Sequence, residues 1–292
     1  MPNNPEKGYY IFYSMISIII CSRNKDIPEQ LKSNIEATIG VQYELVVIDN
    51  SKQDYSIFSA YNEGIRRASY NYLCFMHEDI LYCSDDWGKK VIAHLSAPEI
   101  GLIGLAGSYY LLHIPSPWFK AKPRVKNLIQ TRRPSKAPKH YTLDECKKVV
   151  CVDGFWFCSR KDVFMQIAFD EKIFNRFHFY DLDISMQIHE KGYSIYIIPD
   201  ITVNHFSGGS LNKQWLESAY LFHEKWKHSL PVTVYPSLKK SPLVEVKAFR
   251  DLLYLHKKHK VPITGAIRRI GWDNLKFGIV GAYLLLMLKR LF

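Results

Sequence analysis

Residues 60–79, AYNEGIRRASYNYLCFMHED, place a helix-like segment with Asn62 directly before an apolar strand that stops at acidic residues. The strand YLCFM runs into His77 and Asp79, with one further acid between them. Carboxylate oxygens suit cations such as Mg²⁺ and Mn²⁺, and open α/β sheets hold their ligands at the carboxyl ends of strands. The stretch therefore predicts an α/β enzyme with a metal at the edge of its sheet.

Strands and helices alternate on the amino-terminal side of this stretch. A β-branched run at 16–21 is typical of a strand that is buried on both faces, and ELVVIDN at 44–50 predicts a second strand. Helices are expected at 28–39 and 55–68, before the third strand at 72–76. This order predicts a parallel sheet with right-handed crossovers.

The regular pattern is interrupted once before it resumes. A further strand is expected at 101–107, whereas residues 108–148 are rich in Pro, Lys and Arg and suggest a long basic loop or flap over the site. Apolar segments return at 149–160. We expect a catalytic domain over residues 1–230 and a basic, helical tail over 231–292.

Positive charge is concentrated in two segments. Residues 115–140 contain eight Lys or Arg and no acid, and residues 237–292 contain twelve basic and three acidic residues, a net of +9. The whole chain has a formal charge of +11, so the remainder has 11 − 8 − 9 = −6. Localised positive charge attracts phosphates of nucleic acid, of an anionic membrane surface or of a lipid diphosphate.

The cysteines indicate a reducing compartment. None of the six shows CxxC spacing, and Cys21 and Cys74 lie in or beside apolar runs, so we expect reduced thiols and neither a zinc site nor disulfides. The amino-terminal apolar run has no small-residue cleavage site after it, which favours a strand over an export signal. We expect a cytoplasmic protein, with peripheral contact to the inner face of the membrane as an option.

Seven segments together resemble the family-two glycosyltransferases with the GT-A fold. They are SIIICSRNK, ELVVIDNS, AYNEGIRRA, YLCFMHED, VDGFWFCSR, YDLDISMQIHEKGYSIYIIPD and VNHFSGGS, and they span roughly residues 15–212. The chain is most similar to a bacterial subgroup with an HxD metal motif. The resemblance implies a Rossmann-like α/β fold, with a mostly parallel sheet, flanking helices and a helical C-terminal appendage. It also implies inverting, metal-dependent sugar transfer from a nucleoside-diphosphate sugar, by default a UDP-sugar.

Nucleotide contacts are expected from the loops after the first two strands and from the helix before the metal strand. The residues are Ser22, Arg23, Asp49, Asn50, Ser51 and Asn62. The two loops should meet at the carboxyl edge of the sheet. Asp49 could accept a hydrogen bond from a base or a ribose hydroxyl, or it could cap its own turn.

The resemblance implies metal ligands at Asp79 and His205. Asp79 matches the last acid of the DxD motif, whose metal bridges the two donor phosphates; the ion is expected to be Mn²⁺ or Mg²⁺. His77 replaces the first acid, and it could contact ribose or phosphate, bind the metal or be structural. His205 matches a histidine that completes the metal site in several family members, although a structural role is the alternative.

The family's general base matches Asp181 in the segment YDLD, where Tyr180 stands in place of the usual Glu. A carboxylate in the first turn of a helix can also serve as a cap, for Asp181 as for Asp183. The resemblance places Asp153, Gly154 and Trp156 in the cavity for the sugar and the acceptor. An acceptor hydroxyl that loses its proton to Asp181 would displace the diphosphate in line and invert the anomeric centre.

The apolar segment at 277–288 gives an indication of the acceptor's identity. Twelve helical residues span only about 18 Å, against about 30 Å for a hydrocarbon core, so the segment should not cross a bilayer. It could lie on an anionic leaflet, or pack on this domain or on a second subunit in a homodimer. The first option points to a lipid-linked saccharide acceptor in cell-surface polysaccharide or lipopolysaccharide assembly.

Two other functions are compatible with parts of the sequence. A sugar-1-phosphate nucleotidyltransferase would also use a parallel sheet and an acidic metal site, but CSRNKD follows the first strand where a Gly-rich basic loop is expected. A nucleic-acid-binding protein would explain the basic segments. These segments flank an acidic core without a recognised binding module, so we expect no nucleic-acid partner.

Overall fold

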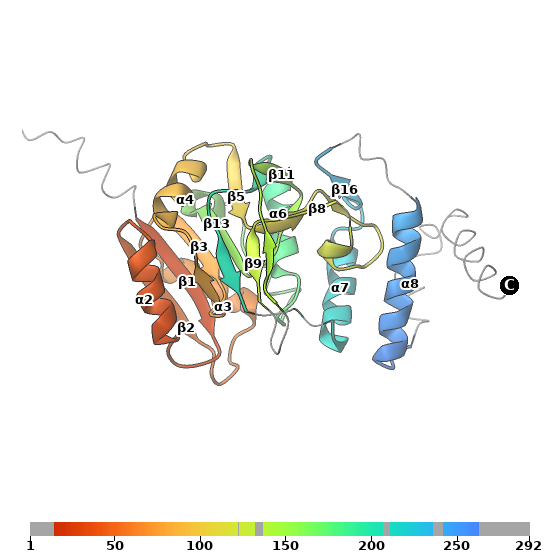
Figure 1. Cartoon of the computed structure of the whole chain (residues 1–292). Coiled ribbons are helices and arrows are strands. Elements are labelled where there is room, and N and C mark those ends of the chain that lie inside the picture. Colours follow the sequence, from red (N-terminus) through yellow and green to blue (C-terminus); the bar gives the residue numbers. More distant parts are fainter. Residues whose placement is uncertain are drawn as a thin grey trace, which may run out of the picture. The chain divides into compact units, whose positions relative to one another are not determined.

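The structure is a computed structural model that describes residues 15–262, except 122, 132–136, 207–208, 210 and 236–241 (Figure 1). The chain divides into two compact units. The first contains residues 1–107 and 125–208, and the second contains 108–124 and 209–292. The sequence predicts one border, at residue 230. In the structure the second unit begins at residue 209 and also includes residues 108–124 from the middle of the chain.

The first unit is built on a seven-stranded sheet with the order β11-β14-β5-β13-β3-β1-β2. Its strands are β1 (Ile16–Ser22), β2 (Tyr43–Asp49), β3 (Tyr72–Met76), β5 (Ile100–Gly104), β11 (Lys147–Val149), β13 (Trp156–Arg160) and β14 (Ser194–Ile197). β1 pairs in parallel with both β2 and β3, as the alternating pattern predicted. β13 runs antiparallel to both β3 and β5, and β11 runs antiparallel to β14, so the sheet is mixed.

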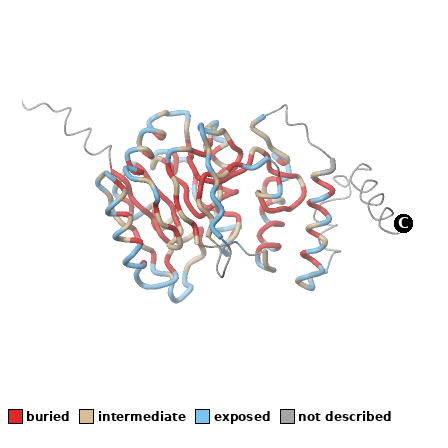
Figure 2. Tube along the Cα trace, in the orientation of Figure 1, coloured by how far each residue is buried: buried red, intermediate tan, exposed pale blue. Residues whose placement is uncertain are grey.

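Helices flank this sheet and bury its apolar faces. They are α2 (Glu29–Thr38), α3 (Ile57–Arg67), α4 (Trp87–Leu95), the short α5 (Lys161–Phe164) and α6 (Tyr180–Glu190). All five residues of β3 are buried, which explains its continuous apolar sequence (Figure 2). A Cβ at Gly64 in α3 would lie 2.3 Å from Ile19, so this glycine permits close packing of α3 on β1.

Two smaller sheets complete the first unit. One has the order β10-β9-β15-β4, with β4 (Ile80–Tyr82), β9 (Leu128–Gln130), β10 (Lys139–Tyr141) and β15 (Val203–His205). The other joins β12 (Cys151–Val152), β6 (Ala106–Ser108) and β8 (Arg124–Lys126). The expected loop at 108–148 therefore contains short strands among its described residues. Their backbone groups pair with distant segments such as β15, and no local pattern reveals such pairing.

The second unit contains α7 (Lys213–Lys225), α8 (Pro242–Lys258), the 3-10 turn η1 (Trp118–Lys120) and the pair β7 (Tyr110–Leu111) and β16 (Val232–Thr233). The buried carboxylate of Glu245 in α8 accepts hydrogen bonds from the backbone N–H groups of His113 and Ile114, at 2.9 and 3.0 Å. These bonds attach the inserted segment to α8. Within the described residues, every helix is too short or too polar to span a bilayer.

Candidate active site

Three side chains of the first unit converge at the carboxyl end of β3. His77 and Asp79 follow this strand directly, and β4 begins at Ile80. Antiparallel pairing of β15 with β4 places His205 opposite Ile80 and so beside Asp79. One ligand atom from each of His77, Asp79 and His205 lies within 4.8 Å of the others, which makes these three residues a candidate metal cluster.

Two atoms of this cluster are buried without a hydrogen-bond partner among the described residues. They are Asp79 Oδ1 and His205 Nε2, which lie 3.6 Å apart. Nδ1 of His77 lies 3.8 Å from the same Asp79 oxygen. Buried polar atoms are costly unless they are paired, and a cation among these atoms would pair them. The residues therefore fit a divalent metal, and two imidazole nitrogens with one carboxylate suit Mn²⁺ and related transition metals better than Mg²⁺.

Neighbouring groups hold both imidazoles in place. The backbone N–H of His77 donates to the carbonyl of Phe155 at 2.9 Å, and the Phe155 ring stacks on His205 with 4.5 Å between centroids. His77 Nε2 lies 2.7 Å from the hydroxyl of Tyr180. Burial lowers the pKa of His77 and of His205, which favours the neutral rings that metal binding requires.

Glu78 links this cluster to the loop after β1. Its carboxylate accepts a hydrogen bond from Ser22 Oγ at 2.5 Å and one from the backbone N–H of Arg23 at 3.4 Å. Ser22 is buried, and its hydroxyl also accepts from Asn24 N–H at 3.1 Å. The predicted nucleotide loop and the metal loop are thus joined by Glu78. Sequence reasoning missed this role of Glu78, which lies in a bend between β3 and β4.

The loop after β2 is shaped by its own polar side chains. Asp49 is exposed at the strand end, and hydrogen bonds from the hydroxyl and the backbone N–H of Ser51, the latter at 2.9 Å, lower the pKa of Asp49. The side-chain amide of Asn50 forms two hydrogen bonds with the backbone of Tyr55: it donates to the carbonyl at 3.0 Å and accepts from the N–H at 2.9 Å. The bonds between Asp49 and Ser51 correspond to the turn role that is the alternative for Asp49. Nucleotide contacts of this loop stay predictions.

Two other residues with predicted ligand contacts, the half-buried Asn62 and the buried Trp156, have partners within the protein. The amide of Asn62 is occupied by the backbone of Phe169, to which it donates at 2.8 Å and from which it accepts at 3.1 Å. Trp156 is 0% exposed, and its indole N–H donates to Tyr82 at 2.9 Å. The structure thus gives both side chains structural partners and places Trp156 in the core, where a sugar does not reach it. Their predicted ligand contacts have no support from this geometry.

Asp181 lies in the first turn of α6, beside the loop that carries Asp153. One carboxylate oxygen accepts from Gly154 N–H and the other from Leu182 N–H, both at 2.9 Å. Burial, followed by the neighbouring charge of Asp153, raises the pKa of Asp181 to about 7. A carboxylate with this pKa is suited to accept a proton near neutral pH.

Two other carboxylates lie near Asp181: Asp153, whose charge acts on it, and Asp183, two residues later in α6. Their surroundings differ. Burial also raises the pKa of Asp153, while the nearby His205 and Lys126 oppose that shift. Asp183 is fully buried and accepts from Gln187 Nε2 at 2.8 Å, one helical turn away. Asp183 therefore has the surroundings of a structural residue, although the bond from Gln187 comes from a side chain of the same helix and not from the backbone N–H groups that a cap would bind.

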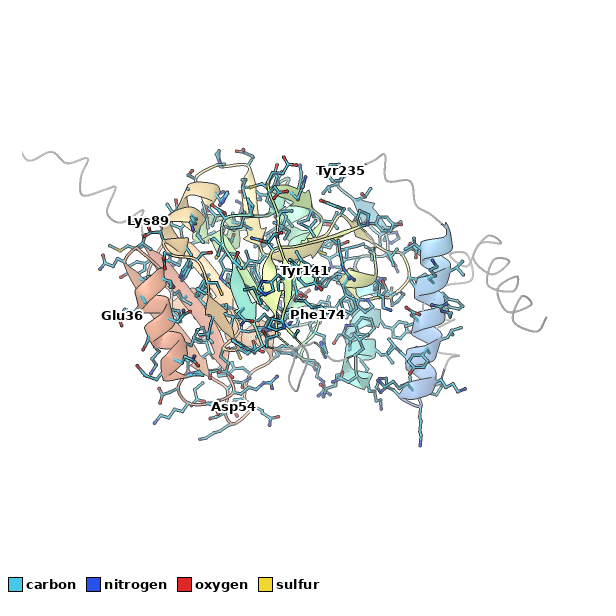
Figure 3. The ribbon with its side chains drawn as sticks, viewed as in Figure 1. Glu36, Asp54, Lys89, Tyr141, Phe174 and Tyr235 are labelled. Carbon is cyan, nitrogen blue, oxygen red and sulfur yellow. The ribbon has the colours of Figure 1, made fainter. Side chains whose placement is uncertain are left out.

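Aromatic side chains pack against Tyr180, which precedes Asp181 in α6. Phe58 stacks on Phe174 with 4.9 Å between centroids and meets Tyr180 edge-on at 6.3 Å (Phe174 is labelled in Figure 3). An open depression of about 410 Å³ lies beside this group, lined by residues 53–56, Ser59 and two residues of the segment 171–175. No residue of the candidate metal cluster lines it.

Comparisons with known proteins bear on the family and the fold of the chain. The model of a glycosyltransferase-like family matches residues 17–227. The chain is similar to the crystal structure of GalNAc-T7 with UDP, GalNAc and Mn²⁺, with a TM-score of 0.51, 11% identity and coverage of 86% of this chain but only 58% of that chain.

Weaker similarities are to S. aureus TarS (TM-score 0.47, 10% identity, 83% of this chain and 43% of that chain) and to A197 from STIV (TM-score 0.41, 13% identity, 66% and 86%). No curated protein matches the sequence. At these identities the structural likenesses indicate the fold alone.

Proposed function

This chain belongs to the glycosyltransferase-like family whose model it matches, and on that basis we propose that it transfers a sugar from a nucleoside-diphosphate sugar to an acceptor hydroxyl with the help of a divalent cation. The observation that carries the proposal is the cluster of His77, Asp79 and His205, with its two buried and unpaired atoms. A UDP-sugar and Mn²⁺ are the first choices, because the GT-A structure of GalNAc-T7 contains UDP and Mn²⁺.

The proposed mechanism assigns separate tasks to the two halves of the site. Charge that develops on the leaving diphosphate would be neutralised by a cation at His77, Asp79 and His205. Asp181, oriented by the Gly154 N–H, accepts the proton of the acceptor hydroxyl as the acceptor oxygen bonds to the anomeric carbon. The bond from that carbon to the diphosphate breaks on the opposite face, so the transfer inverts the anomeric configuration.

A thermal-shift screen of UDP-, GDP- and dTDP-sugars with and without Mn²⁺ tests this function. One sugar nucleotide should raise the unfolding temperature by about 5 °C at roughly 100 times its Kd with Mn²⁺, and should give no such shift without a divalent cation. Mg²⁺ should support a smaller shift, because two of the three ligands are imidazoles. Equal shifts without any cation would contradict the proposal. Release of pyrophosphate from a nucleoside triphosphate and a sugar-1-phosphate would favour a nucleotidyltransferase.

We also propose that the second unit contacts an anionic membrane surface, which would bring the enzyme to a lipid-linked acceptor. Among the side chains of α8 that the structure describes, the exposed ones recur at helical spacing on one face; they are Lys247, Arg250, Tyr254, Lys257 and Lys258. Tyr254 is 64% exposed between these cations, an arrangement suited to a headgroup layer. The tail segment at 277–288, with its leaflet and homodimer alternatives, lies outside the described residues.

Sedimentation with lipid vesicles tests this contact. The full chain should sediment with vesicles that contain phosphatidylglycerol but not with pure phosphatidylcholine, and less so as salt rises. The double variant Lys247→Glu with Lys257→Glu should lose most of this binding, whereas Lys32→Glu with Lys89→Glu, an equal charge change in the first unit, should keep it. Equal sedimentation with neutral vesicles, or binding that RNA competes away completely, would contradict membrane contact.

A further inference from the structure

We propose that Tyr180 is a positioning residue that keeps the imidazole proton of His77 on Nε2 and thereby presents Nδ1 to the cation. The inference rests on the proposed metal site and deepens it. His77 and Tyr180 occupy the two positions where the resemblance leads one to expect acids. They are 103 residues apart in the chain, yet the Tyr180 hydroxyl and His77 Nε2 are 2.7 Å apart. The two residues that depart from the family pattern, His77 and Tyr180, therefore contact each other.

The two nitrogens of His77 face different surroundings. Nδ1 lies 3.8 Å from Asp79 Oδ1, within the candidate metal cluster, while Nε2 faces Tyr180. A neutral imidazole carries one proton, and the nitrogen that binds a metal cannot carry it. With a cation at Nδ1, the proton would be on Nε2, where it would be donated to the Tyr180 oxygen. Metal-binding histidines in proteins commonly use their second nitrogen in this way, which fixes both the tautomer and the ring orientation.

The Tyr180 ring is held where this bond requires it. Tyr180 is 3% exposed and meets Tyr61 edge-on with 5.5 Å between centroids. A Cβ on Gly154 would lie 2.1 Å from the Tyr180 oxygen, so glycine at 154 leaves the hydroxyl its space. Gly154 also donates its N–H to Asp181, the residue that follows Tyr180 in α6. One turn of helix thus positions both a metal-site histidine and the proposed base.

Manganese binding without a donor tests the inference. Free Mn²⁺ measured by electron paramagnetic resonance should show about 10- to 100-fold weaker binding for Tyr180→Phe, which keeps the ring and removes only the hydroxyl. Tyr193→Phe is a matched control, because its hydroxyl accepts from Gln166 at 2.9 Å on the surface of the same unit. This control should bind Mn²⁺ like the natural chain. Equal affinities for Tyr180→Phe and the natural chain would overturn the inference.

The tautomer can be observed directly in the natural chain, even if Tyr180→Phe folds poorly. In spectra of ¹⁵N-histidine-labelled protein near pH 8, His77 should carry its proton on Nε2, with its signals assigned by their loss in His77→Gln. A proton on Nδ1 would overturn the inference.

Two further variants separate this inference from the proposed function. Asp79→Ala and His205→Ala should both lose Mn²⁺ binding. If they do and Tyr180→Phe does not, only the role of Tyr180 is wrong. If Asp79→Ala binds Mn²⁺ like the natural chain, the metal site itself is wrong, and the role of Tyr180 falls with it.

Discussion

Replacing Asp79 by alanine should abolish Mn²⁺-dependent stabilisation by the donor and reduce sugar transfer to background. Oδ1 of Asp79 faces both imidazoles, at 3.8 Å from His77 and 3.6 Å from His205, and Asp79 is the only anionic member of this cluster. Without it, two neutral rings remain to hold a divalent cation near a diphosphate. The thermal shift with donor and Mn²⁺, compared with the shift with donor alone, measures the effect.

The pair of His94 and Asp200 supplies a matched control for this variant. Asp200 Oδ1 lies 2.9 Å from His94 Nε2, so Asp200→Ala also removes a carboxylate from a histidine in the first unit. It lies outside the metal cluster and should leave the Mn²⁺-dependent shift intact. A full shift in Asp79→Ala, or an equal loss in both variants, would contradict the assignment of Asp79.

Replacing Asp181 by asparagine should leave donor and Mn²⁺ binding intact but slow transfer by about 10²- to 10⁴-fold, the usual contribution of a general base. Asparagine has nearly the same shape and cannot take up the acceptor proton. The matched control is Asp183→Asn, because Asp183 is a buried carboxylate in the same helical turn that accepts from Gln187. Turnover numbers at saturating donor measure the effect. Full turnover by Asp181→Asn would refute its role as the base.

The pH dependence of transfer should follow the same carboxyl group. The base must be ionised, and the pKa of Asp181 is about 7, so kcat/KM should rise with pH below about 7 and level off above it. A folded-state pKa raised above the ordinary value of Asp also means that folding favours the protonated form. This contribution to the free energy of unfolding is present at low pH and is lost as the pH rises through about 7. Asp181→Asn should lack both effects, which pH–rate profiles and denaturant titrations measure.

A glycosyltransferase-like family and the GT-A fold could be predicted from the sequence, and both are confirmed, whereas the inverting mechanism and the HxD subgroup stay predictions. β1 and β3 could be predicted because strands buried in a parallel sheet are continuous apolar runs, such as ISIIIC at 16–21, whereas the half-exposed edge strand β2 could be predicted from its shorter apolar core LVVI. The antiparallel direction of β13 could not be predicted from the sequence, because the path of the chain from β5 to β13 decides how β13 pairs with β3 and β5. The strands among the described residues of 108–148 are three residues long or shorter, and β9 pairs both with its neighbour β10 and with the distant β15.

The candidate site shows the same limit at the level of side chains. The family motifs indicated His77, Asp79 and His205, and the register of β15 on β4 brings the third residue to the other two. The same motifs could not distinguish an amide that binds a ligand from one that is satisfied by backbone, as with Asn62 and Phe169. The contact of Tyr180 with His77 depends on packing across the fold, and no local sequence pattern encodes it.

Anomalous scattering from crystals grown with Mn²⁺ and a nucleoside diphosphate tests the central claim most directly. The account predicts one strong manganese peak within about 2 to 2.5 Å of His77 Nδ1, Asp79 Oδ1 and His205 Nε2, with diphosphate oxygens completing its coordination. A diphosphate bound with no manganese beside Asp79, or manganese held elsewhere while this cluster stays empty, would contradict it.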